Sequence, residues 1–399
     1  MRLILLSTLA ASFIWGVNTL FLLDAGLSNT EAFAANAFFT VGQVLCEIPT
    51  GVVADVRGRR VSYLLGAGTL LLTTLAYLWL WQIEGPFWAW AVVSALLGLG
   101  FTFFSGATEA WLVDALNFTK FKGDLDGVFA RGQAIGGVAM LTGSVLGGIV
   151  AQYTNLGVPY LIRSALLGLT LITAARMMFD LGFTPDKTLT PSRQVRRVLK
   201  ASIDNGLKKP PVRYVMLAAP FAGGVGIYIF YAMQPYLLEL YGDPSAYSVA
   251  GLAAAIVAGA QIAGSMLVKQ VRGLFRYRTG LLLTSAALSA GLIGLAGFVQ
   301  NFWVVIVILV GWGLVSALTM PVRQAYLNGL IDSKHRATVL SFDSLMSSSG
   351  GVVAQPILGR VADVSGYAAS YVVASAFQLV ALPFLLLARR QNAPSDPID

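Results

Sequence analysis

The sequence predicts an all-α membrane protein in which twelve transmembrane helices form two pseudo-symmetric six-helix bundles. Three observations carry this prediction: the composition, the number of long apolar stretches, and a repeat that relates the two halves. Apolar residues make up 56% of the 399 residues and charged residues 12%. Soluble domains carry roughly 25% charged residues. A soluble core of this size would not need so many apolar side chains, so the excess indicates contact with lipid.

Twelve apolar stretches are each long enough, at about 20 residues, to cross about 30 Å of hydrocarbon as a helix. They cover residues 3–23, 32–55, 62–82, 87–116, 127–153, 158–181, 212–240, 246–269, 279–299, 302–330, 337–362 and 368–388. The first stretch begins like a signal peptide, but its apolar run continues to Leu23. We therefore expect an uncleaved helix at the start of the chain.

One long polar segment separates the two sets of six stretches. It predicts an N-terminal bundle over 1–182, a basic cytoplasmic linker over 183–211, a C-terminal bundle over 212–390 and a short cytoplasmic tail over 391–399. Apolar residues recur every four positions within the linker, at Val195, Leu199, Ile203 and Leu207. This spacing favours an amphipathic helix on the inner leaflet, and a solvated tether between the bundles is an equal alternative.

The two halves resemble copies of one another. Residues 143–151 align with residues 355–363, and the segment from Gly42 to Arg60 aligns with the segment from Ala260 to Arg278. A repeat of six helices places a substrate route at the interface of the halves, near the membrane midplane.

Basic residues concentrate in the loops that follow the even-numbered stretches. Examples are Arg59 and Arg60 after the second stretch, Lys120 and Lys122 after the fourth, and the run 269–278 after the eighth. The positive-inside rule places these loops, and with them both termini, in the cytoplasm. The same bias and attraction to anionic lipid explain the net charge of +8, so no nucleic-acid partner is expected.

A single cysteine, Cys46, and a single histidine, His335, limit the possible chemistry. One cysteine cannot form a disulfide within the chain, and neither residue has the neighbours that a cysteine- or histidine-based metal site requires. Nucleophile–base pairs and phosphate-binding loops do not occur at a usable spacing. We therefore expect no cofactor, no metal site and no enzymatic activity.

At the end of the second stretch the chain reads Gly51-Val-Val-Ala-Asp55-Val56-Arg-Gly58-Arg59-Arg60. This segment resembles the signature between helices 2 and 3 of the major facilitator superfamily, although Val56 stands where that family has a basic residue. The resemblance implies the major facilitator fold and a transport function. In the family this motif locks the cytoplasmic side, and Asp55 would face the start of the eleventh helix near Arg336.

The resemblance also implies partners for the basic end of the motif. Arg59 or Arg60 would meet Asp114 at the end of the fourth helix. Arg131 on the fifth helix would join Asp114 in a structural charge network, and Asp343, which aligns with Arg131 in the repeat, is expected to be a structural partner.

The fifth helix carries Gly143, Ser144, Gly147 and Gly148. This segment resembles the family's antiporter signature, in which a proline stands where this chain has Ser144. The resemblance favours export. Small residues that permit close packing of helices are the alternative explanation.

Two acidic residues resemble those of a subgroup of bacterial exporters: Glu47 in the second helix and Glu109 in the fourth. This resemblance implies the bacterial inner membrane as the location. A buried carboxylate is costly, and its pKa is raised by desolvation and lowered by a nearby cation. A carboxylate between these two effects can carry protons, so Glu47 and Glu109 are candidates for proton coupling, with a structural role as an equal alternative.

Helices 1, 4, 7 and 10 line the substrate cavity in this family. The polar and aromatic candidates there, with two repeat-related glutamines, are Asn18, Gln43, Phe101, Phe104, Ser105, Thr108, Tyr228, Tyr231, Gln234, Gln261, Trp312 and Ser316. Aromatic rings with few fixed charges suit an amphipathic organic compound better than an inorganic anion or a sugar phosphate.

We therefore expect a monomeric secondary transporter that uses the proton gradient to export small amphipathic or hydrophobic organic compounds by alternating access. An importer or facilitator of a small metabolite is the alternative, and a non-transporting receptor on the same scaffold is a remote one. The expected partners are a small-molecule substrate and membrane lipids.

Overall fold

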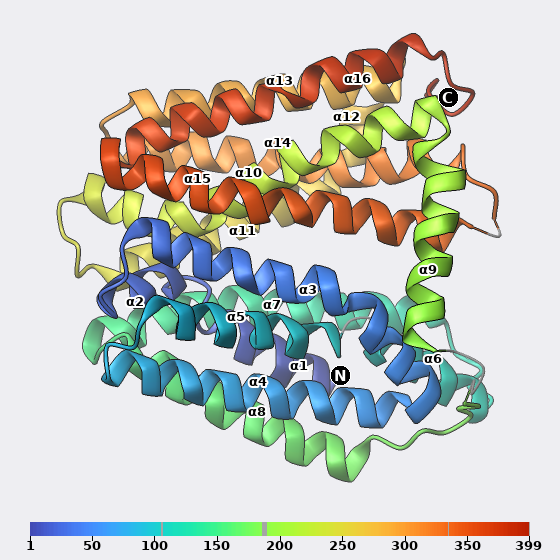
Figure 1. Cartoon of the computed structure of the whole chain (residues 1–399), viewed down its shortest axis with the longest axis horizontal. Coiled ribbons are helices and arrows are strands. Elements are labelled where there is room, and N and C mark those ends of the chain that lie inside the picture. Colours follow the sequence, from blue (N-terminus) through green and yellow to red (C-terminus); the bar gives the residue numbers. More distant parts are fainter. Residues whose placement is uncertain (105–106, 186–189, 334, 399) are drawn as a thin grey trace. The chain divides into compact units, whose positions relative to one another are not determined.

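The computed structural model describes residues 1–104, 107–185, 190–333 and 335–398, which form helices, loops and one isolated β-bridge. Figure 1 labels the helices along the chain. Contacts divide the chain into two units. Unit 1 holds residues 1–27, 38–195 and 245–255, and unit 2 holds residues 28–37, 196–244 and 256–399. The boundary near residue 195 lies inside the predicted linker.

The helices of the first half follow the predicted apolar stretches closely. They are α1 (Arg2–Ser12), α2 (Asn18–Asp24), α3 (Asn29–Arg57), α4 (Arg59–Gln82), α5 (Phe87–Thr102), α6 (Ala107–Phe118), α7 (Leu125–Tyr153) and α8 (Gly157–Met177). The linker forms α9 (Pro191–Ser202) and the π-helical turn η1 (Ile203–Leu207).

The second half repeats this pattern. Its helices are α10 (Pro210–Tyr241), α11 (Tyr247–Met266), α12 (Val268–Arg272), α13 (Arg278–Phe298), α14 (Phe302–Asn328), α15 (Arg336–Leu379) and α16 (Ala381–Arg390). Ten helical segments among the described residues are long and apolar enough to cross a membrane. The predicted all-α membrane fold is confirmed.

Three predicted spans differ from single straight helices. The first is interrupted over residues 13–17, where Trp15 and Val17 donate to carbonyls only three residues back, at 3.0 and 3.1 Å. The fourth divides into α5 and α6, and the twelfth is interrupted between α15 and α16. Broken helices survive in a bilayer where the freed backbone groups are buried in protein or line a cavity.

Gly366 lies between the last two predicted spans, inside α15. Its φ of 84° falls in the left-handed region, where glycine meets no steric penalty. The predicted division of this segment is therefore confirmed by the backbone, although the helix label runs through it.

Glycines of α7 allow α1 to pack directly against its backbone. A Cβ added at Gly147 would lie 1.9 Å from the Phe13 carbonyl oxygen, and one added at Gly143 would lie 2.0 Å from Ser12 Oγ. A side chain has no room at either position. These contacts provide the packing explanation for the glycine-rich segment.

Buried aromatic rings cluster at one end of unit 1. Phe21 stacks on Tyr160 with ring centroids 3.9 Å apart, and Tyr77 shares a 2.6 Å hydrogen bond with Ser94. Arg163 on α8 is also buried, and it donates to Thr74 Oγ1 at 3.1 Å and to the Ala10 carbonyl at 3.3 Å. Its guanidinium thus satisfies a carbonyl close to the interruption of the first span.

The repeat predicted from the sequence recurs in the way helix ends are capped. In unit 2, Asp363 accepts hydrogen bonds from the backbone N–H groups of Asn29 and Thr30, at 2.9 and 2.8 Å, where α3 begins. In unit 1, Gln152 accepts from the N–H of Ser248 at 3.3 Å, where α11 begins. A side chain from α15, just before its break at Gly366, or from the end of α7 thus accepts from backbone N–H at the start of another helix.

The linker helix α9 buries Val198 and Ser202 against the protein. Leu199 and Ile203, on the apolar face expected to meet the inner leaflet, are 41% and 42% exposed. The placement of this face on the membrane stays a prediction. Beyond α9, Lys208 donates to Asp204 at 2.7 Å, and this bond lowers the pKa of the Asp204 carboxyl.

The C-terminal tail is folded back onto unit 2. Asp396 accepts from the N–H of Thr279 at 2.8 Å and from its hydroxyl at 2.7 Å, and Ser395 donates to the Tyr326 carbonyl at 2.8 Å. The Asp396 carboxylate therefore caps the N-terminus of α13, where a negative charge is favourable. The predicted tail over 391–399 is thus part of the packed bundle as far as residue 398.

We predict that Gly147→Ala destabilises the protein by about 1–3 kcal/mol, because the new methyl group overlaps the Phe13 carbonyl. Gly168→Ala on α8 is the matched control, since a Cβ there meets nothing within 4 Å. Thermal unfolding of the purified protein in detergent measures both variants. Equal melting temperatures for the two would contradict the close packing of α1 and α7.

We predict that Asp396→Ala loosens the tail and lowers stability by about 1 kcal/mol, the typical value of an N-cap. Carboxypeptidase should then shorten the tail faster than in the parent protein. Asp126→Ala, at an exposed position of α7, serves as the control. A digestion rate unaffected by Asp396→Ala would show that the cap does not hold the tail.

Candidate functional site

The predicted gating motif lies at the turn between α3 and α4 in unit 1. Gly58 has a φ of 103°, which favours glycine. This turn places Arg59 Nη1 2.6 Å from Asp55 Oδ1 and Arg59 Nε 4.0 Å from Asp114 Oδ2. One guanidinium therefore lies between carboxylates of α3 and α6.

Asp180 holds the start of α4 and was missed by the sequence analysis. Its Oδ1 accepts from the N–H of Arg60 at 2.8 Å, and a Cβ on Gly58 would lie 2.2 Å from its Oδ2. The Arg60 side chain donates to the Ala175 carbonyl at 2.6 Å. Asp180 had been placed inside the sixth span, but α8 ends at Met177. The sequence did offer one signal for Asp180, an acidic residue at the predicted cytoplasmic end of a span, where basic residues predominate.

The remaining members of the gating set do not gather around this turn in the same way. Arg131 on α7 is exposed, and none of the ion pairs found among the described residues includes it. The predicted network of Arg131 with Asp114 is therefore not present in this structure. Arg336 is the exposed first residue of α15 in unit 2, and its pairing with Asp55 stays a prediction.

The two candidate coupling acids occupy different environments. Glu47 lies within α3 and is partly buried. Glu109 lies in the first turn of α6 and is exposed, so the prediction of a buried carboxylate is wrong for this residue. The reason is loose packing, because α6 buries only Ala107 of its own residues.

Asp343 on α15 forms a buried ion pair with Arg323 on α14, joining Arg323 Nη2 to Asp343 Oδ1. Both residues are less than 10% exposed. Removing one partner of such a pair leaves an uncompensated buried charge. The pair therefore ties α14 to α15 within unit 2.

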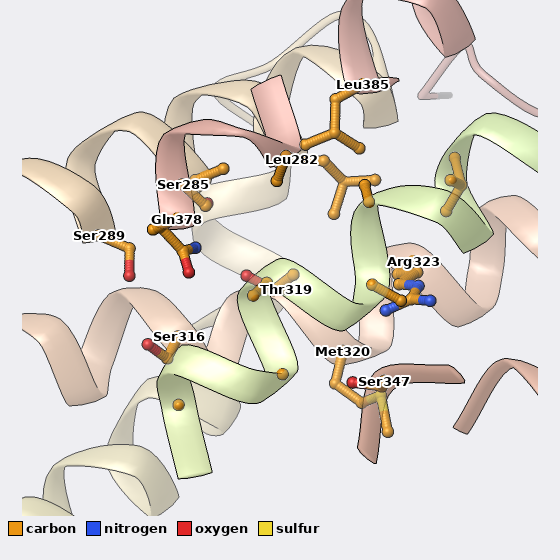
Figure 2. Close-up of a pocket in the computed structure, with 18 of the residues that line it drawn as sticks. Leu282, Ser285, Ser289, Ser316, Thr319, Met320, Arg323, Ser347, Gln378 and Leu385 are labelled. Carbon is orange, nitrogen blue, oxygen red and sulfur yellow. The ribbon is translucent and has the colours of Figure 1, made fainter. Parts of the chain in front are cut away.

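A cavity of about 240 Å³ lies beside this ion pair, between α10, α11, α13, α14, α15 and α16 of unit 2. Of the predicted substrate residues, Gln261, Trp312 and Ser316 line it. Figure 2 shows Arg323 at one end of the cavity, and Ser285, Ser289 and Gln378 toward the other.

These last three residues were missed because only helices 1, 4, 7 and 10 were expected to line a cavity. Ser285 and Ser289 lie four residues apart on α13, and Gln378 lies near the end of α15. Two serines at helical spacing in an apolar span were the available signal.

The cavity lining carries almost no net charge. Arg323 is the one charged residue among the described lining residues, and Asp343 neutralises it. The other polar lining residues are neutral: Gln261, Ser285, Ser289, Ser316, Thr319, Ser347 and Gln378. The walls between them are apolar, with Trp312, Leu282 and Leu385 as the largest side chains.

Other predicted substrate residues pack within their own unit. The hydroxyl of fully buried Tyr228 donates to Ser370 Oγ at 2.6 Å, and Asn18 Oδ1 accepts from Tyr160 at 3.0 Å. Phe104 packs edge-on against Tyr63, with centroids 4.4 Å apart. Substrate contact at Tyr228 would require this packing to open.

The remaining predicted substrate residues differ in how far they are buried. Phe101 is 42% exposed. Gln43, Thr108 and Tyr231 are partly buried, and Gln234 is buried. Ser105 lies outside the described residues.

Comparisons with protein families match one family model to nearly the whole chain. The family model described as Major Facilitator Superfamily matches residues 3–289 and 248–398. A search of curated proteins finds no match.

Solved structures of transporters resemble this chain along nearly its full length. A crystal structure of the nucleoside transporter NupG aligns with a TM-score of 0.77 and 12% identity, covering 97% of this chain and 98% of that one. A D-xylose-proton symporter aligns with a TM-score of 0.69 and 16% identity, covering 96% and 94%. A bacterial homolog to the human lysosomal transporter Spinster aligns with a TM-score of 0.69 and 14% identity, covering 97% and 95%. At these identities the likeness shows the fold alone.

We predict that Asp343→Asn destabilises the protein by about 3–5 kcal/mol, because it leaves the Arg323 charge buried without its counter-charge. The double variant Arg323→Met with Asp343→Leu should recover most of this loss, since apolar side chains replace both charges. Unfolding of the purified variants in detergent measures the difference. A double variant no more stable than Asp343→Asn would contradict this account of the pair.

Proposed function

Since the chain belongs to the major facilitator superfamily, and is a membrane transporter rather than an enzyme, we propose that it exports small amphipathic or hydrophobic organic compounds in exchange for protons. The observation that carries this proposal is the cavity of unit 2. Its walls combine apolar and aromatic side chains with neutral hydrogen-bonding groups. Such a lining suits a compound with an apolar body and an uncharged polar group.

Proton coupling requires a carboxylate that takes up and releases protons during the cycle. Glu109 on α6 is exposed at the protein surface, whereas Glu47 on α3 is partly buried. We assign the coupling role to one or both of these residues. The proton gradient is then the energy source.

The contacts at the turn between α3 and α4 support a gating role for the motif from Gly51 to Arg60. Arg59 contacts Asp55 within 2.6 Å, while its contact with Asp114 is longer, at 4.0 Å. The longer contact costs less to break, because Coulomb attraction between part-exposed charges is weakened by water. Alternating access in this proposal breaks and re-forms the Arg59–Asp114 contact, with Asp180 keeping the start of α4 in place.

The proposal includes the cellular setting. The protein acts as a monomer in a bacterial inner membrane, with both termini in the cytoplasm, where basic loops meet anionic lipid. The resemblance of α7 to an antiporter signature favours export, although its glycines also have the packing role described above.

Import of a small polar metabolite is a second candidate function. The observation that favours it is the number of hydroxyl and amide groups in the cavity, which a sugar-like or nucleoside-like compound could use. The direction of transport separates the two. Import predicts that expressing the protein raises the amount of substrate in cells, and export predicts that it lowers it.

We predict that Glu109→Gln, Glu47→Gln or both abolish proton movement triggered by an amphipathic compound. Proteoliposomes loaded with a pH-sensitive dye and challenged with a panel of such compounds measure this. Glu84→Gln, in the loop between α4 and α5, is the control and should leave the signal intact. Transport of a compound by the parent protein without any proton movement would identify facilitated transport and a structural role for both acids.

A further inference from the structure

Gln378 has a polar atom that the folded chain leaves without a partner. The residue is 4% exposed and lines the cavity of unit 2. Its Oε1 is buried and accepts no hydrogen bond from the described residues. Ser285 and Ser289, each 5% exposed, line the same part of the cavity (Figure 2).

A buried carbonyl oxygen without a donor is unfavourable, because water no longer solvates it and no protein group replaces water. Buried polar atoms are therefore nearly always satisfied by protein, by water or by a ligand. Gln378 Oε1 lies at a cavity, so a donor can reach it. That donor has to be an O–H or N–H group, since the amide oxygen can only accept.

The charge of the lining restricts the ligand further. Asp343 neutralises Arg323 at the opposite end of the cavity, and no acid is among the described lining residues. A charged ligand would lose its hydration without gaining a counter-charge. The volume of about 240 Å³ is also below the roughly 300–1,000 Å³ of pockets for drug-sized ligands.

We propose that this cavity is a binding subsite for an uncharged amphipathic compound that donates an O–H or N–H group to Gln378 Oε1. The apolar body of the compound packs against Trp312, Leu282 and Leu385. Gln378 is then a specificity-determining residue contributed by α15, and Ser285 and Ser289 complete the polar end from α13. This inference rests on the proposed transport of amphipathic compounds and names their chemical class.

Four probes with one shared body test this specificity: 4-propylphenol, 4-propylanisole, 4-propylbenzoate and 4-propylbenzylamine. The first is neutral with a donor, the second neutral without one, the third an anion and the fourth a cation at neutral pH. Because Cys46 is the only cysteine, Cys46→Ser with Ser316→Cys leaves one reporter thiol, in the cavity. Protection of this thiol from iodoacetamide, read by mass spectrometry, reports binding in detergent without any gradient.

We expect 4-propylphenol to protect the thiol at about tenfold lower concentration than 4-propylanisole, the effect of one hydrogen bond to an otherwise unpaired buried acceptor. The charged probes should protect least. Gln378→Leu should remove the preference for the phenol and retain binding of the anisole. Gln391→Leu, at an exposed position outside the cavity, should leave the preference unchanged. The probe-induced shift in melting temperature, which follows ligand affinity, should give the same ranking without a reporter thiol.

Equal binding of phenol and anisole, or a preference that survives Gln378→Leu, would overturn the inference and assign a structural water to Gln378. Tightest binding of a charged probe, or no binding of any of the four, would also overturn it. These outcomes are independent of proton coupling. If no exchange of compound for protons is observed, the predicted order of probe affinities still stands. If the probes do not bind in the predicted order, the result of the proton-coupling experiment still stands.

Discussion

The structure depends on the constraint that a bilayer supplies no water to polar groups, so the chain has to satisfy its own. The buried charged residues show how the chain meets this constraint. Asp343 neutralises Arg323 between α14 and α15, and Arg163 is satisfied in part by a hydroxyl and a backbone carbonyl. Several buried polar atoms of the described residues have no hydrogen-bond partner, and the Gln378 oxygen is one that lies at a cavity. A ligand in this cavity could supply the missing donor, which is the basis of the proposed subsite.

Helix interruptions obey the same constraint. The break over residues 13–17 packs against the glycines of α7, where no side chain would fit, and buried Arg163 donates to a carbonyl just before it. At the turn between α3 and α4, Asp180 accepts from the N–H of Arg60 in the first turn of α4, while Arg59 contacts two carboxylates. Irregular backbone and fixed charge therefore occur where protein groups can pair with them.

The sequence was sufficient for features that depend on composition and local spacing. Apolar length located the spans to within a few residues, whereas the contact of Arg59 with Asp114 was expected from the family resemblance and not from local spacing. Features that depend on distant partners were missed. No local signal shows that Asp396 caps α13, that Asp180 caps α4, or that Ser285 and Gln378 share a cavity, because each contact joins residues far apart in sequence. The predicted burial of Glu109 rests on its depth within the fourth stretch, whereas α6 buries only Ala107 of its own residues.

The central claim is that protons moving one way drive an uncharged amphipathic compound the other way. It is tested most directly with proteoliposomes that have an acidic lumen and a neutral exterior, in which uptake of radiolabelled 4-propylphenol is followed. The account predicts accumulation inside above the external concentration, lost when the gradient is dissipated and in the variant lacking both Glu47 and Glu109. Accumulation only when the exterior is the acidic side would identify symport, and equilibration without accumulation, but faster than in protein-free liposomes, would identify facilitated transport. Either result would contradict the account.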